Sequence, residues 1–197
     1  MKTTLLLSGG LDSVCLAHQL YRKGIAVYAV SFDYGQRHKK ELGYAKKTAN
    51  KLGFVHTVLS LPLAGRSALL GTFEVPQGFD PADSIQKATI VPNRNMAMLS
   101  LAATVGEGPL CVACNASDAA VYPDCRGEFL TALSACLEFA TGRVIQAPFV
   151  ALPKCEIVKH YKGMGLGIED SWSCYRGEDV PCGQCGPCIA IEQAGGL

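Results

Sequence analysis

Ser8-Gly9-Gly10-Leu11-Asp12-Ser13 links a short apolar run, residues 4–7, to an amphipathic run, residues 14–20. The first run predicts a β-strand and the second predicts an α-helix, so the paired glycines form the turn between them. Two adjacent glycines allow backbone N–H groups to point towards one place, where the positive end of the helix dipole also lies. We therefore expect this loop to bind a phosphate or a pyrophosphate.

The loop differs from two common phosphate-binding motifs. It lacks the lysine of the Walker A loop, and it does not contain the Gly-x-Gly-x-x-Gly of dinucleotide-binding folds. Asp12 would repel a phosphate, so we expect its carboxylate either to hold Mg²⁺ or to cap the helix. The simpler alternative is an ordinary strand-to-helix turn capped by a serine or by this aspartate.

Strand-like and helix-like segments alternate along the rest of the chain. Residues 25–30 are apolar and rich in β-branched side chains, which indicates a strand buried on both faces. We expect further strands at residues 54–61, 109–113 and 143–147, helices at residues 39–52, 96–105, 128–141 and 155–164, and loops at residues 31–38, 61–90, 114–124 and from 170 onwards. This alternation predicts an α/β fold with a doubly wound, mostly parallel sheet, whose ligands bind outside the carboxyl ends of the strands.

The composition fits one globular domain of 197 residues, with 49% hydrophobic and 18% charged residues. The formal net charge is +1, which offers no basic field for nucleic acid. No apolar run reaches the length of a membrane span, and the first residues do not read as a signal peptide. We therefore expect a cytoplasmic protein without a nucleic acid or membrane partner.

Four of the ten cysteines lie close together near the C-terminus: Cys174, Cys182, Cys185 and Cys188. The last three follow a C-x₂-C-x₂-C pattern with small residues between them, and Cys174 can supply a fourth ligand. Four thiolates at this spacing predict a closed, structural Zn²⁺ site, with an iron–sulfur cluster as the alternative. We accordingly divide the chain into an α/β domain, residues 1–169, and a zinc-binding segment packed on it, residues 170–197.

The other cysteines have a different expected role. Five are scattered through apolar segments, and we expect them to be small buried side chains: Cys15, Cys111, Cys114, Cys136 and Cys155. Cys125 lies in a polar segment, and nothing in the sequence indicates the lowered pKa of a nucleophilic thiol.

Polar side chains gather where predicted strands end or predicted helices begin. Residues 31–38 include an aromatic ring, an amide and a guanidinium group, which suit a planar polar ligand or a phosphate. Arg94 and Lys154 lie near the starts of two helices, where cations favour a bound anion and stabilise a departing pyrophosphate. The alternative for each is a solvated charge.

A second polar segment follows the predicted strand at residues 109–113. Asn115, Asp118 and Asp124 offer hydrogen-bonding groups for a base-like heterocycle, and Tyr122 can stack on it. Asp124 can instead cap the helix that follows.

These segments together resemble the 7-cyano-7-deazaguanine synthases, a family of the ATP pyrophosphatase group that acts in the queuosine precursor pathway. The matching segments are residues 8–13, residues 31–38, Pro92-x-Arg94-Asn95, Tyr122-Pro123-Asp124-Cys125-Arg126 with Glu128-Phe129, Lys154-x-Glu156-Ile157, and Ser173-Cys174-Tyr175 with the late cysteines. They are spread in order over nearly the whole chain. The first segment is specific only to the larger group, whereas the Phe-Asp-Tyr-Gly-Gln-Arg-His and Tyr-Pro-Asp-Cys-Arg strings are specific to the family.

The resemblance implies an ATP-dependent carbon–nitrogen ligase with a sheet of the adenine nucleotide alpha-hydrolase type. This enzyme would convert 7-carboxy-7-deazaguanine and ammonia to 7-cyano-7-deazaguanine through adenylate and amide intermediates. The implied cofactors are ATP, Mg²⁺ and structural Zn²⁺ on the four late cysteines, and the implied assembly is a homodimer.

The resemblance also implies roles for individual residues. The implied catalytic residues are Asp12, Arg94 and Lys154. The implied ATP-binding residues are Leu7, Ser8, Gly9, Gly10, Leu11, Asp12, Ser13 and Ser31. The implied substrate-binding residues are Tyr34, Gln36, Arg37, Asn115, Asp118, Tyr122, Asp124 and Arg126.

The chain departs from the family pattern at two places. Ala120-Val121 stands where the family usually has Ser-Gly, and Asn93 stands where it usually has a small residue. These differences leave open a homologue that stops at the 7-amido-7-deazaguanine stage or accepts a related deazapurine. Two further alternatives are a tRNA sulfur-transferring ATP pyrophosphatase and a non-catalytic, nucleotide-binding zinc protein.

Overall fold

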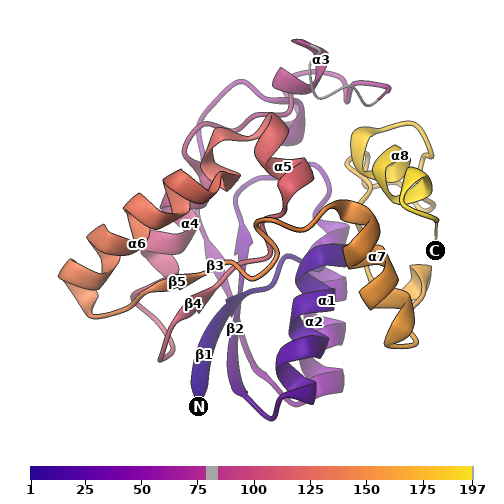
Figure 1. Ribbon diagram of the computed structural model, residues 1–197. Helices are drawn as coiled ribbons and strands as arrows, with labels where there is room; N and C mark the ends of the chain where they lie inside the picture. The colour runs from indigo at the N-terminus through magenta and orange to yellow at the C-terminus, as the bar shows by residue number, and fades with distance from the viewer. Residues whose placement is uncertain (79–83, 197) are drawn as a thin grey trace.

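Five parallel strands form one sheet, in the order β3-β2-β1-β4-β5 (Figure 1). The strands are β1 (Lys2–Leu6), β2 (Ala26–Asp33), β3 (Val55–Ser60), β4 (Leu110–Cys111) and β5 (Ile145–Gln146). The computed structural model describes residues 1–78 and 84–196. Because β1 lies between β2 and β4, the glycine turn that follows it opens at the point where the strand order reverses, which is where ligands bind in such sheets.

Helices cover both faces of the sheet. They are α1 (Leu11–Arg22), α2 (Lys40–Leu52), α4 (Arg94–Ala102), α6 (Gly127–Thr141) and α7 (Lys154–Gly163). Alternate side chains of the first strand enter two separate cores, since strand side chains point to opposite faces. Leu5 packs with α1, α2 and α7, and Leu6 packs with α4 and α6. The predicted doubly wound α/β fold is therefore confirmed (Figure 1).

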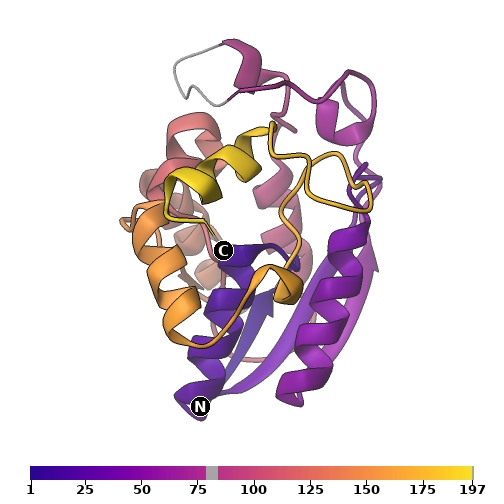
Figure 2. The same cartoon turned by 90° about the vertical axis from the view of Figure 1, so that its right-hand side faces the viewer.

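Six short elements complete the described chain: η1 (Ala68–Leu70), α3 (Ser84–Lys87), α5 (Ala116–Val121), η2 (Pro123–Cys125), η3 (Ile168–Asp170) and α8 (Gly186–Gln193). Residues 61–90 contain only η1 and α3, and residues 79–83 of this segment lie outside the described part. Figure 2 shows α8 in yellow above α7 in orange on the same side of the molecule. No described helix is long and apolar enough to cross a membrane.

Besides residues 61–90, which contain α3, two further segments that we expected to be loops contain helices, so the loop expectation is wrong for all three. The first helix, α5, starts because Asn115 Oδ1 accepts hydrogen bonds from Ser117 N at 2.9 Å and Asp118 N at 3.1 Å. The second helix, α8, begins at Gly186 with a proline in its first turn. Both start from local capping signals rather than from hydrophobic periodicity.

The second strand is longer than expected. Ser31, which the sequence placed in a loop, pairs in register with Val58 of β3. The prediction of buried, scattered cysteines is correct for three positions and wrong for Cys136 and Cys155, which are exposed. Both lie in helices, α6 and α7, at positions on the side that faces away from the core.

Candidate active site

The turn after β1 depends on glycine at position 9. Gly9 has a φ of +91°, and a Cβ added there would collide with the carbonyl oxygen of Glu41 in α2. Left-handed backbone and this close approach both exclude a side chain. The start of α2 therefore packs directly against the loop.

Serine hydroxyl oxygens accept hydrogen bonds from the backbone N–H groups of this loop. The three hydrogen bonds run from Gly9 N to Ser13 Oγ at 3.1 Å, from Gly10 N to Ser8 Oγ at 3.2 Å and from Leu11 N to Ser173 Oγ at 3.1 Å. The third bond brings the cysteine-rich segment against the start of α1. Each N–H group donates to a different serine hydroxyl, one of which comes from the far end of the chain.

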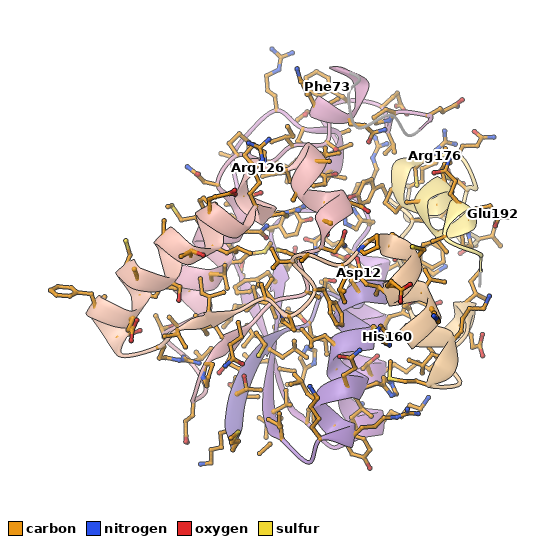
Figure 3. All side chains as sticks on the ribbon, viewed as in Figure 1. Asp12, Phe73, Arg126, His160, Arg176 and Glu192 are labelled. Atoms are coloured by element: carbon orange, nitrogen blue, oxygen red, sulfur yellow. The ribbon has the colours of Figure 1, made fainter. Side chains whose placement is uncertain are left out.

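Lys154 and Asp12 form an ion pair beside the loop. The Lys154 Nζ lies 2.8 Å from Oδ1 and 2.6 Å from Oδ2 of Asp12, and the two side chains are 14% and 20% exposed. Burial alone would lower the pKa of Lys154, but the Asp12 and Asp118 carboxylates more than offset it, so the pKa is raised. Figure 3 shows Asp12 in the middle of the molecule, between α1 and α7. Its expected alternative role as a helix cap is wrong, since the N-cap of α1 is Gly10 and has no side-chain cap.

The side-chain amide of Asn115 links Asp118 to Asp12 through hydrogen bonds. Asn115 Nδ2 donates to Asp12 Oδ2 at 3.2 Å and to Asp118 Oδ2 at 2.7 Å. Burial raises the pKa of Asp118 to about 6; Lys154 opposes the shift and Asp12 adds to it. Two carboxylates thus converge on one place beside a single ammonium group, where a further cation would be favourable.

Arg94 faces the same region from the first turn of α4, among tyrosine side chains. Its Cζ lies 5.9 Å from the ring centre of Tyr34 and 5.7 Å from that of Tyr122. The Tyr122 hydroxyl lies 3.1 Å from the hydroxyl of Tyr175. Within the described residues, no carboxylate lies at ion-pair distance from Arg94. This guanidinium group can therefore receive an anionic ligand.

The four late cysteines meet at one point, as the sequence predicts. Their sulfur atoms all lie within 4.8 Å of one another. Cys185 Sγ is 4.0 Å from Cys174 Sγ and 3.5 Å from Cys188 Sγ. Tetrahedral zinc with bonds of about 2.3 Å would need sulfur atoms about 3.8 Å apart. The cluster therefore has the size of a site for a single metal ion.

A cavity of about 240 Å³ opens at the carboxyl ends of the strands and gathers most of the predicted residues. Its wall includes Leu7, Ser8, Gly10, Leu11, Asp12, Ser13, Ser31, Tyr34, Arg94, Asp118, Tyr122 and Lys154. Gly9 and Asn115 are outside the wall but hydrogen-bond to residues in it. Tertiary packing thus brings together residues from the loop, from α4, from α5 and from α7.

Besides Asn115, four predicted substrate-binding residues do not line the cavity: Gln36, Arg37, Asp124 and Arg126. Gln36 is buried and stabilises its own loop, because its Oε1 accepts a hydrogen bond from Tyr34 N at 2.8 Å. Asp124 Oδ2 accepts from Asn95 N at 2.9 Å and so holds the start of α4 rather than the helix that follows. Arg126, labelled in Figure 3, lies near the end of α6 that meets α5 and donates to a backbone carbonyl. Substrate contact by these four stays a prediction that the cavity geometry does not support.

Sequence reasoning missed several residues of the cavity wall. They are His38, Glu41, Trp172, Ser173 and Tyr175. Three of these lie within two residues of Cys174 in the sequence, and that proximity was a usable signal, because a metal-ordered segment holds its neighbours in fixed positions. Glu41 carried no comparable signal, since a glutamate in the first turn of a helix is usually solvated.

Comparison with known proteins decides the family. A family model described as queuosine biosynthesis protein QueC matches residues 2–195. The chain belongs to the QueC family. The 7-cyano-7-deazaguanine synthase of Methanoregula boonei is 43% identical over 211 residues, covering 99% of this chain and 96% of the relative. The enzyme of the same name from Marinobacter nauticus is 39% identical over 197 residues, covering 95% of this chain and 89% of the relative.

QueC membership confirms the prediction of a 7-cyano-7-deazaguanine synthase. The fold is shared more widely. The NMN synthetase of Francisella tularensis aligns with this QueC protein at a TM-score of 0.54 and 16% identity, covering 99% of this chain and 77% of that chain. At this identity the likeness concerns the fold alone, and it agrees with the predicted sheet.

Proposed function

We propose that this cavity activates 7-carboxy-7-deazaguanine with ATP and converts it, with ammonia, to 7-cyano-7-deazaguanine. The Lys154–Asp12 ion pair beside the serine-lined glycine turn carries the proposal, since it places a fixed cation next to a set of N–H and O–H donors. Arg94 adds a second cation, and the N-terminus of α1 adds its dipole. This combination suits the triphosphate of a nucleotide. Membership of the QueC family supports the choice of acid.

The chemistry explains why ATP is needed. A carboxylate is a poor electrophile, because its negative charge makes the carbonyl carbon unreactive. Attack of a carboxylate oxygen on the α-phosphorus of ATP forms an acyl adenylate and releases pyrophosphate. Ammonia then attacks the carbonyl carbon, the C–O bond to AMP breaks, and the amide forms. A second ATP activates the amide oxygen, and loss of AMP and of both N–H protons leaves the nitrile.

The residues at the loop would divide this work. The N–H groups and hydroxyls of Ser8, Gly10 and Ser13 would bind the phosphates, replacing the hydrogen bonds they now make with one another. Lys154 and Arg94 would stabilise the charge that develops on the departing pyrophosphate. Cations that are already fixed in place stabilise the developing charge without any rearrangement of the protein during the reaction. Such electrostatic stabilisation is usually the largest contribution that an active site makes to the rate.

Asp12 and Asp118 would hold Mg²⁺. Both carboxylates lie within hydrogen-bond distance of one amide, and carboxylate oxygens are the ligands that this ion prefers. Mg²⁺ bound there supplies neutralisation of the phosphate oxygens. The four late cysteines would hold Zn²⁺, and this site would keep Ser173 and Tyr175 at the cavity.

The cavity also suits flat heterocycles. Its wall includes the rings of Tyr34 and Tyr122 together with the apolar side chains of Phe32 and Met98. Such side chains pack against the faces of purine-like rings, and polar groups of the site then form hydrogen bonds with the ring edges. We propose that the two aromatic residues at positions 34 and 122 bind the deazapurine.

Three expectations from the sequence analysis complete the proposal. They are a homodimer, a cytoplasmic location and the division of the chain at residue 169 into an α/β domain and a zinc-binding segment. Light scattering during gel filtration tests the first, and limited proteolysis with and without a chelator tests the third.

Product masses test the proposed reaction. The protein is mixed with ATP, Mg²⁺, ammonium and 7-carboxy-7-deazaguanine, and the products are identified by mass spectrometry. The nitrile supports the whole sequence of steps. The amide alone means that this homologue stops after the first ATP. Absence of acid-dependent pyrophosphate release from folded, zinc-loaded protein overturns the proposal.

A further inference from the structure

The start of α2 places an unusual pair of side chains in the cavity wall. Glu41 and His38 both line the cavity, and they are only 8% and 3% exposed. Glu41 Oε1 lies 3.3 Å from Gln36 Nε2, which donates to it, and 3.5 Å from His38 Nε2. Neither residue belongs to the phosphate-binding or metal-binding groups described above.

Within residues 1–78 and 84–196, one polar atom of the pair has no partner, and the Glu41 carboxyl group has no cation beside it. In the described part of the chain, His38 Nδ1 is buried without a hydrogen-bond partner. Glu41 Oε1 accepts the contacts above, and among the described residues no lysine or arginine lies at ion-pair distance from this carboxyl group. A buried carboxyl group without a neighbouring cation and a buried imidazole nitrogen without a hydrogen-bond partner are costly, and such groups are retained where a ligand completes them.

The pair lies close to the phosphate-binding loop. The backbone of Glu41 touches Gly9, so the carboxyl group belongs to the helical turn that packs against the phosphate-binding loop. Arg94 acts on both side chains: after burial, it is the next largest influence on each pKa, opposing the rise at Glu41 and adding to the burial that lowers the pKa of His38 to about 4. The two side chains and Arg94 therefore share one pocket of low dielectric.

A ligand that completes Glu41 and His38 must be small and rich in N–H donors. Ammonium has this chemistry, and the proposed reaction needs it as the nitrogen source. We infer that Glu41 and His38 form the site that binds ammonium and takes a proton from it, an inference that rests on the proposed function. Gln36 acts as a positioning residue, since it holds the Glu41 carboxyl group in place.

Proton transfer at this site makes the nucleophile. Ammonium passes one proton to the Glu41 carboxylate and becomes neutral ammonia, whose lone pair is then free. The nitrogen attacks the acyl adenylate, a C–N bond forms, and the C–O bond to AMP breaks with its electron pair leaving on the phosphate. The Glu41 carboxyl group releases the first proton to solvent, and its carboxylate then takes a second proton from the attacking nitrogen and releases that one too.

The surroundings favour the neutral nucleophile over the cation. Burial raises the pKa of Glu41 to about 8, with Arg94 and Gln36 opposing the shift, so the carboxylate is basic enough to accept a proton near neutral pH. The guanidinium group of Arg94 repels a second cation in the same cavity, which favours ammonia over ammonium once the proton has moved.

A different N–H-rich ligand is the amide and amino edge of the deazapurine itself. Recognition of that edge by Glu41 would affect binding of the acid in the first, ammonia-independent step. The adjacency of α2 to the phosphate-binding loop favours ammonium, because the reacting carboxyl group must reach the α-phosphate there. The two assignments therefore predict different kinetic changes.

The test separates adenylation from amide formation in zinc-loaded protein. Acid-dependent exchange of labelled pyrophosphate into ATP, measured without ammonium, reports adenylation alone. Amide formation is then measured over a range of ammonium concentrations. The variants are Glu41→Gln and His38→Gln; the second keeps a donor in the place of Nε2 and removes Nδ1. Glu138→Gln is the matched control, since it makes the same chemical change at an exposed position of α6.

We expect both test variants to keep the exchange rate and the KM for the acid within about twofold while the KM for ammonium rises at least about tenfold, as for a lost hydrogen bond to a charged group. Hydroxylamine, which is largely neutral at this pH, should still trap the adenylate at the wild-type rate. An unchanged KM for ammonium overturns the inference. A raised KM for the acid assigns Glu41 to the deazapurine edge instead. Absence of exchange in the unmodified protein refutes the proposed function rather than the ammonium site.

Discussion

Replacing Lys154 by methionine removes one charge from the site while keeping the length of the side chain. The ammonium group contacts both Asp12 oxygens, at 2.8 Å and 2.6 Å, from a position that is 14% exposed. Removing one partner of a buried ion pair costs about 3–5 kcal/mol. Partial exposure and the Asn115 amide reduce this, so we expect a loss of about 2–3 kcal/mol in the free energy of unfolding. For a chain of this size the melting temperature should fall by about 4–10 °C.

Two further variants show whether the charge or the packing is responsible. Lys51→Met removes a lysine whose partner Asp170 lies 3.2 Å away but whose own side chain is 52% exposed, so it should cost at most about 1 kcal/mol. The double variant Asp12→Asn with Lys154→Met removes both charges of this ion pair and should recover about half of the lost stability. Urea denaturation followed by circular dichroism measures all of these values.

Catalysis should respond differently from stability. Lys154→Met should lower acid-dependent pyrophosphate exchange by about 10²-fold or more, because a fixed cation at the departing pyrophosphate is lost. The double variant should remain as slow, since neither change restores that cation. The reasoning is refuted if Lys154→Met is no less stable than Lys51→Met, or if the double variant regains exchange.

Three other predictions concern the loop, the metal and the buried acid. Gly9→Ala should cost more stability in urea than Gly142→Ala, since both positions have positive φ but only the first would collide with a neighbour; equal losses would contradict this. Metal removal by a chelator should shift the emission of the single tryptophan, Trp172, to longer wavelength and stop pyrophosphate exchange, because Ser173 then releases the loop; retained exchange would contradict it. Between about pH 6 and pH 8, wild-type stability should fall as pH rises, since an unfolded glutamate is already ionised whereas the pKa of Glu41 is raised to about 8 in the fold; an equal slope for Glu41→Gln would refute this.

Much of the site could be predicted from the sequence because its chemistry is carried by short segments. The glycine turn sits between an apolar run and a helical run, and this arrangement indicates a phosphate-binding loop wherever it occurs. The C-x₂-C-x₂-C spacing likewise brings three thiolates together by local geometry alone. The structure confirms that four sulfur atoms converge.

Other parts could not be predicted, because nearby sequence does not determine them. Loop assignments at α5 and α8 failed since a single capping side chain or a proline can start a short helix without any periodic pattern. Gln36 and Arg126 looked equally available for a ligand, yet the first is buried in its own loop and the second donates to a backbone carbonyl. Which side of a loop faces the cavity depends on what packs behind it.

The sequence by itself determined the kinds of group present: a glycine-serine loop, cations near the starts of helices and a set of four thiols. Tertiary structure decided which of them meet. Lys154 reaches Asp12 across 142 residues, and Ser173 reaches Leu11 across 162. These contacts arise because parallel strands need long crossover connections, which carry distant segments to the same edge of the sheet. Glu41, an ordinary helix-start residue in the sequence, becomes a buried acid only because α2 packs against Gly9.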